Sequence, residues 1–168
     1  MSLASDTRGS DLCRSCGLCC DGTLFNWVPV EASERQALDN LRLKIVDGPD
    51  GPRFKLGSPQ LQATVCGVYD DRPLMCRSFT CKLYKRHVAG EISLEDASAV
   101  VTEVQEARRQ LHARIAELPG GGAHTPVADL DPRTLLLRLA IRRLVARRFQ
   151  DPDVQDPDVP GSSFTRSG

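Results

Sequence analysis

The sequence predicts a small, irregular α+β fold in which a cysteine-rich half of loops and short strands packs against two or three α-helices. All seven cysteines lie between positions 13 and 81 of a 168-residue chain, and two long segments after position 90 have helical periodicity. With 13 Gly and 11 Pro, loops are expected to occupy much of the rest. A loop-rich half with few apolar side chains needs a cross-link, and inside cells a cysteine-held metal is the usual one. We therefore expect a metal to staple the first half.

A chain of this length is expected to form one domain with tails. We predict a disordered arm over residues 1–10, a single metal-binding domain over 11–149, and a disordered tail over 150–168, where Gln-Asp-Pro-Asp-Val occurs twice. An odd cysteine number, the vicinal pair Cys19-Cys20 and a polar N-terminus argue against a secreted disulfide framework. No apolar run approaches the ~20 residues of a membrane span. The expected location is the cytoplasm, away from membranes.

The cysteine-rich half is predicted to contain three short elements. Residues 24–30 alternate apolar and polar side chains, as a short strand does, although Pro29 limits its pairing. Residues 31–43 have the apolar spacing of a helix, with acidic side chains at its start. The Gly- and Pro-rich turn at 47–52 is expected to separate this helix from a hairpin-like segment that pairs 54–56 with 63–65.

Two longer helices are predicted in the second half. The first runs from Leu94 to Leu118, with Ser93 as its N-cap and apolar residues at intervals of three and four. The second runs from Pro132 to Phe149, with Asp131 as its N-cap and proline at its first position.

The second helix carries six arginines between Arg133 and Arg148 and no acidic residue. A solvated basic face on a packed helix is the ordinary interpretation, and an acidic protein partner is the alternative. Nucleic acid is not expected, because base-reading aromatic residues are missing. The formal net charge of zero likewise gives no long-range attraction for polyanions.

The first cysteine cluster has the spacing of a metal site. Cys13, Cys16 and Cys19 stand three residues apart, which suits half of a tetrahedral zinc site or the opening of a bacterial ferredoxin motif that holds a [4Fe–4S] cluster. Adjacent Cys19 and Cys20 direct their side chains differently, so both reaching one ion is awkward. Seven thiols are too many for one tetrahedral ion and one short of two four-cysteine sites. Zinc, iron and iron–sulfur therefore remain open.

The complete pattern reads Cys13-x-x-Cys16-x-x-Cys19-Cys20, then Cys66-x-x-Tyr69-x-x-Arg72-Pro73-x-x-Cys76-Arg77-x-Phe79-x-Cys81. It resembles the YkgJ-type cysteine-cluster family of bacterial proteins, described as having a zinc- or iron-chelating domain. A related cysteine pattern occurs in flagellin lysine methylases. The resemblance covers about residues 11–84.

This resemblance implies that the cysteines bind metal as a set, namely Cys13, Cys16, Cys19, Cys20, Cys66, Cys76 and Cys81. It further implies that a frame holds them, made of Tyr69, Arg72, Pro73, Arg77 and Phe79. Pro73 would set the bend before Cys76, and Arg77 would face the thiolates.

The chain departs from the family where members often carry a further cysteine, because Ser58 stands in that neighbourhood. Serine is a poor ligand for soft metals, so Asp21, Asp70 or a water molecule is expected to complete a second site. His87 is a further candidate ligand, although a surface role suits it better.

The sequence contains no recognisable nucleophile–base pair, phosphate-binding loop or zinc-protease motif, which speaks against an enzyme. The leading interpretation is a metal-binding protein. The alternatives are an iron–sulfur redox protein or accessory to lysine methylation, and a zinc module whose Arg133–Arg148 helix binds an acidic partner or nucleic acid.

Overall fold

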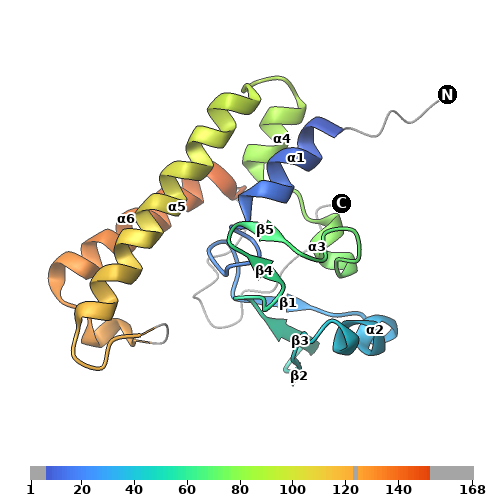
Figure 1. Ribbon diagram of the computed structural model, residues 1–168, viewed down its shortest axis with the longest axis horizontal. Coiled ribbons are helices and arrows are strands. Elements are labelled where there is room, and N and C mark those ends of the chain that lie inside the picture. The colour runs from blue at the N-terminus through green and yellow to red at the C-terminus, as the bar shows by residue number, and fades with distance from the viewer. Residues whose placement is uncertain (1–6, 123–124, 152–168) are drawn as a thin grey trace.

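The computed structural model describes residues 7–122 and 125–151, and it confirms a small α+β fold (Figure 1). Its α-helices are α1 (Thr7–Cys16), α2 (Arg35–Asn40), α3 (Leu74–Ser78), α4 (Lys82–Val88), α5 (Leu94–Glu117) and α6 (Pro132–Phe149). Short 3₁₀ turns occupy Ala32–Glu34 and Val127–Asp129. No helix among the described residues is long and apolar enough to cross a lipid bilayer.

The strands form two small antiparallel sheets. β1 (Trp27–Pro29), β2 (Ile45–Gly48) and β3 (Gly51–Lys55) make one sheet in the order β1-β3-β2. β4 (Leu61–Gln62) and β5 (Val65–Cys66) make a separate two-stranded sheet. Pro29 lies opposite Arg53 on an edge strand, where a missing backbone N–H is tolerated.

The two long helices match their predictions within one residue. Ser93 Oγ accepts the backbone N–H of Asp96 at 3.0 Å, and the Asp131 carboxylate accepts those of Arg133 and Thr134. These caps satisfy backbone donors that a helix start otherwise leaves without partners. α5 and α6 then run side by side (Figure 1).

The predicted helix over 31–43 is shorter than expected. After the 3₁₀ turn, α2 ends at Asn40, and Arg42 adopts a positive φ of 57° that breaks the helical path. Leu43 nevertheless stays buried, because the turn returns the chain toward the sheet. The apolar spacing therefore predicted the burial of Leu38, but Ala37 of the same predicted stripe is exposed, and the helix is shorter than predicted.

The predicted hairpin has different partners. The turn at 47–52 joins β2 to β3, with Gly51 at a φ of 117°, so Phe54 pairs with Ile45. Residues 63–65 belong instead to the turn and strand of the second sheet. The prediction that 54–56 pairs with 63–65 was wrong, because the nearer strand 45–48 completes the shorter hairpin.

α1 begins at Thr7, inside the segment predicted as a disordered arm over 1–10. Residues 1–6 of that arm lie outside the described residues, as does the predicted tail from residue 152 onward. The tail's first residues are described: Gln150 donates to Leu24 O at 3.4 Å, and Asp151 pairs with Lys85 at 2.8 Å.

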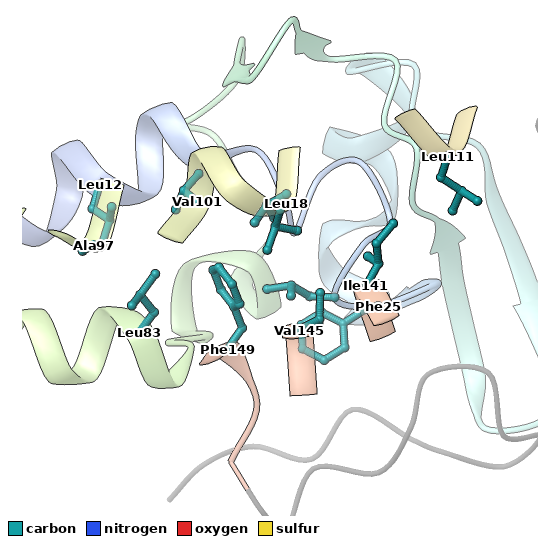
Figure 2. Packing of buried hydrophobic residues seen from close by; sticks show 12 residues of the cluster. Leu12, Leu18, Phe25, Leu83, Ala97, Val101, Leu111, Ile141, Val145 and Phe149 are labelled. Atoms are coloured by element: carbon teal, nitrogen blue, oxygen red, sulfur yellow. The ribbon is translucent and has the colours of Figure 1, made fainter. Parts of the chain in front are cut away.

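Buried apolar side chains form two clusters. The helical core joins α1, α4, α5 and α6 to the loop that carries Leu18 and Phe25 (Figure 2). It contains Leu12, Leu18, Leu24, Phe25, Leu83, Ala97, Val101, Val104, Leu111, Ile141, Val145 and Phe149. The sheet core lies over the first sheet with α2 and α3, and it contains Val28, Val30, Leu38, Leu43, Phe54 and Met75. Leu56 packs against both cores, so they meet near this residue.

The exposed face of α6 mixes arginines with apolar side chains. Leu136 is 66% exposed and Leu139 is 43% exposed, and Arg143 and Arg147 are exposed as well. The described helix therefore keeps a basic outer face, and a protein partner on the Arg133–Arg148 helix stays a prediction.

Candidate metal centre

One cavity of about 80 Å³ is lined by all seven cysteines. They come from the end of α1 (Cys13, Cys16), the following loop (Cys19, Cys20), β5 (Cys66), α3 (Cys76) and the residue before α4 (Cys81). Side chains from both cores complete the wall, among them Phe25 of the helical core and Met75 of the sheet core. The fold thus brings the two sequence clusters to one place, at the junction of the cores.

The end of α1 sets the positions of the first cluster. Cys13 and Cys16 stand three residues apart on the helix and so share one face of it. Gly17 then leaves the helix with a φ of 67°, and a Cβ at this position would lie 2.6 Å from the backbone oxygen of Thr64. Only glycine fits so close to another backbone. Leu18, fully buried, anchors the loop in the helical core.

Two side chains of α5 hold the same loop from the other side. Gln105 Nε2 donates to the backbone oxygen of Cys16 at 2.8 Å, and Arg108 forms an ion pair with Asp21. The Asp21 side chain is 17% exposed and that of Arg108 is 21% exposed. Asp21 also accepts hydrogen bonds from the backbone N–H and hydroxyl of Thr23, at 2.8 and 2.6 Å. Burial raises the pKa of Asp21, an effect that Arg108 opposes.

The second cluster is held by local backbone contacts. Pro73 precedes α3, which carries Cys76. Cys81 caps α4, since its Sγ accepts the backbone N–H of Tyr84 at 3.4 Å. The backbone oxygen of Cys20 accepts the N–H groups of residues 57 and 58 at 3.0 and 2.9 Å, which joins the loop of Cys19 and Cys20 to the segment after β3.

The predicted frame residues divide into those at the cavity and those away from it. Tyr69, Arg72 and Phe79 line the cavity. The Arg72 guanidinium lies 3.5 Å from the Tyr69 ring centroid, and Phe79 packs edge-on against Phe25 with ring centroids 4.7 Å apart. Arg77 is exposed and does not line the cavity, so Arg72 is the arginine that faces the thiols.

The other predicted ligands lie outside the cavity lining. Asp21 pairs with Arg108, and Asp70 pairs with Arg14 at 3.3 Å on an 83% exposed side chain. Ser58 Oγ accepts the N–H of Gln60 at 3.2 Å, and His87 Nδ1 lies 3.1 Å from the backbone oxygen of Ile92. Asp21, Asp70 and Ser58 thus have local partners, whereas His87 Nε2 is buried without a hydrogen-bond partner among the described residues.

Burial raises the pKa of most of the thiols. It is the main cause that brings the pKa of Cys13 to about 11 and those of Cys16 and Cys76 to about 12. The pKa values of Cys19 and Cys81 are also raised, again chiefly by burial. These thiols hold their protons at neutral pH unless a cation displaces them, which is the usual linkage between metal binding and proton release.

Cys20 and Cys66 form a hydrogen-bonded thiol pair. That hydrogen bond is the main cause that raises the pKa of Cys20 and lowers the pKa of Cys66. The charge of Arg72 lowers the pKa of Cys66 further. Cys66 therefore has the most thiolate character of the set.

The seven cysteine sulfurs suit a thiophilic metal, although they do not converge on one point. Among residues 7–122 and 125–151, no three His, Cys, Asp or Glu side chains already converge as ligands. None of the seven cysteines is in a disulfide, so every sulfur is available. The cavity exceeds the volume needed for one water molecule several-fold, which leaves room for sulfurs to turn inward around an ion.

Glu34 is a neighbour of the site that sequence reasoning missed. Its Oε1 accepts the backbone N–H of Leu74 at 2.7 Å, at the start of α3. Its Oε2 is buried and has no hydrogen-bond partner among the described residues. The charge of Glu34 is also one cause of the raised pKa of Cys76. The contact spans 40 positions, and no local pattern around Glu34 indicates it.

Comparison with protein-family models, curated proteins and solved structures finds no match to this chain. Membership of the YkgJ-type family thus stays a prediction from the cysteine pattern. The site is therefore described by its geometry: seven thiols, one arginine and three aromatic rings line a single cavity.

Proposed function

We propose that this protein binds metal, zinc or iron, through its cysteines. The observation that carries the proposal is that all seven line one cavity although they come from five separate segments of the fold. Buried structural cysteines behave as small apolar side chains and have no reason to gather at one place. Thiolates select zinc, copper and iron–sulfur centres over hard cations.

The surroundings supply what a thiolate centre requires. A metal with several thiolates carries negative charge and needs nearby positive groups and hydrogen-bond donors. Arg72 lies at the cavity, and its charge favours the ionised forms of Cys13, Cys66 and Cys76. Backbone N–H groups reach Cys81, and the Phe25–Phe79 pair forms an apolar part of the wall.

Bound metal would join the two cores. The cavity is walled by the helical core on one side and by the sheet core on the other. In small metal sites the binding free energy is largely folding free energy, since unfolded chains have no preformed site. Chelation is therefore expected to abolish the near-UV signal of the cysteine-rich half, whose only Trp is Trp27.

The test is elemental analysis with an absorption spectrum, on protein purified without oxygen and without a metal-affinity column. Zinc at one or two ions per chain with a featureless visible spectrum, or iron with absorbance near ~400 nm, is the expected result. Cys19→Ser is expected to lower the metal content, whereas the matched control His87→Ala, outside the cavity, is expected to leave it unchanged. Metal-free protein that keeps its near-UV spectrum contradicts the proposal.

Iron with an equal amount of acid-labile sulfide would identify the alternative, an iron–sulfur protein with a redox role or a part in lysine methylation. A cytoplasmic location stays a prediction.

A further inference from the structure

The seven cysteines fall into two groups by the elements that hold them. The first group comprises Cys13, Cys16, Cys19 and Cys81. Two are on α1 and one caps α4, a helix that packs against α1. Cys16, Cys19 and Cys81 all pack against the helical core.

The second group comprises Cys20, Cys66 and Cys76. The thiols of Cys20 and Cys66 form a hydrogen bond, so their sulfurs are direct neighbours. Cys76 packs against the sheet core, whereas no cysteine of the first group is among the side chains packed against that core. Adjacent Cys19 and Cys20 thus belong to different groups, in keeping with the opposite directions of neighbouring side chains.

We propose that the cavity holds two metal ions: a closed site made by Cys13, Cys16, Cys19 and Cys81, and an open site made by Cys20, Cys66 and Cys76. This inference rests on the proposed metal binding and adds how the seven cysteines are shared between two ions with different roles. Zinc sites with four protein ligands are structural, whereas those with three keep a position for water or a small ligand. The open site is expected to take an exchangeable ligand.

The groups around the second set of cysteines suit an open site. A divalent ion with three thiolates keeps a single net negative charge, which the guanidinium of Arg72 offsets. Glu34 lies beside α3, which carries Cys76, and its Oε2 is buried without a hydrogen-bond partner among the described residues, although it does not line the cavity. Asp21 and Asp70 are engaged with arginines and do not line the cavity.

The experiment uses Co²⁺ as the probe, added without oxygen to reduced, metal-depleted full-length protein. Wild type is expected to bind two ions per chain. The double variant Cys16→Ser/Cys81→Ser leaves the closed site two thiols, and Cys76→Ser leaves the open site two thiols, so each is expected to bind one ion. Serine is itself a good helix N-cap, so Cys81→Ser preserves the start of α4. Cys13→Ser/Cys19→Ser and Cys66→Ser serve as second variants of the closed and the open site, and far-UV circular dichroism checks that each has folded.

Imidazole then separates open from closed coordination. It is expected to shift the cobalt absorption of Cys16→Ser/Cys81→Ser, which keeps the open site, and to leave that of Cys76→Ser unchanged. One cobalt per chain in wild type, or loss of all cobalt in variants of both groups, overturns the division into two sites while metal binding stands. An imidazole response in Cys76→Ser also overturns it. Wild type that binds neither cobalt nor zinc contradicts the proposed function itself.

Discussion

The ion pair between Arg108 and Asp21 is the contact whose loss we expect to be most informative. Replacing Arg108 with methionine keeps the aliphatic stem and removes the charge. The Asp21 carboxylate is then left in a site where its side chain is only 17% exposed. Because Asp21 follows Cys20 directly, the loss of the ion pair is also expected to disturb the loop that carries Cys19 and Cys20.

The expected cost follows from the burial of the pair. Removing one partner of a buried ion pair costs about 3–5 kcal/mol, because the other charge stays uncompensated. Asp21 keeps its two hydrogen bonds from Thr23, and both charged side chains retain some solvent contact. We therefore expect the lower end, about 3 kcal/mol, or roughly 6–12 °C in Tm for a chain of this size.

The loss is expected to depend on pH in a defined direction. Burial raises the folded-state pKa of Asp21 above 3.8, so the folded protein binds a proton more readily than the unfolded chain does. Stability contributed by this group is then present at low pH and falls as pH rises through the folded pKa. Without Arg108 that pKa rises further, so the destabilisation is expected to be largest at neutral pH and to shrink on acidification.

The assay is urea unfolding of variant and wild type at matched metal content, followed by circular dichroism at several pH values. Arg109→Met is the matched control, since Arg109 is 77% exposed and pairs only with Glu106 on the same helix. It is expected to change stability by less than about 0.5 kcal/mol. Equal losses for the two variants, or a loss at position 108 that does not change with pH, would refute the argument from burial.

Three further substitutions test the fold around the site. Gly17→Ala places a Cβ 2.6 Å from Thr64 O at positive φ, so it is expected to lower the free energy of unfolding in urea by roughly 2–4 kcal/mol and to lower metal content. The matched control is Gly90→Ala, which has open space at a φ of 76° and is expected to cost only about 1 kcal/mol in the same assay. Ser93→Ala removes the cap of α5 and is expected to cost about 1 kcal/mol, measured by thermal melting. Phe149→Ala empties a position that is 1% exposed and is expected to cost about 3–5 kcal/mol, and a loss below 1 kcal/mol would contradict its place in the helical core.

The parts of the fold that sequence reasoning predicted are those with complete local signals. α5 and α6 each have a polar N-cap followed by many turns of apolar spacing, so their bounds follow from neighbouring residues. α1, α3 and α4 have no such signal. Each is short and is stabilised by one buried side chain, namely Leu12, Met75 and Leu83, whose contacts come from distant segments. Tertiary packing decides such helices.

The candidate site shows the same contrast between features with a local sequence signal and features that depend on tertiary packing. Residue type and spacing drew attention to the cysteines, and all seven line one cavity with Tyr69, Arg72 and Phe79, whereas a shared metal and a frame role stay predictions. The expectation for Arg77 was wrong because α3 turns that side chain outward. Glu34 was missed because its position next to α3 depends on how the sheet core closes.

The contacts that α5 makes with the loop of Cys19 and Cys20 have a consequence for biosynthesis. Gln105 and Arg108, which secure the loop, are synthesised after all the thiols. At about 5–20 residues per second, translation from Cys81 to Phe149 takes roughly 3–14 s. During that interval the cysteine thiols emerge from the ribosome before α5 and α6, which later pack around them, are complete. The nascent chain therefore passes through a period of oxidant sensitivity that the finished fold does not share, and conditions that slow translation lengthen it.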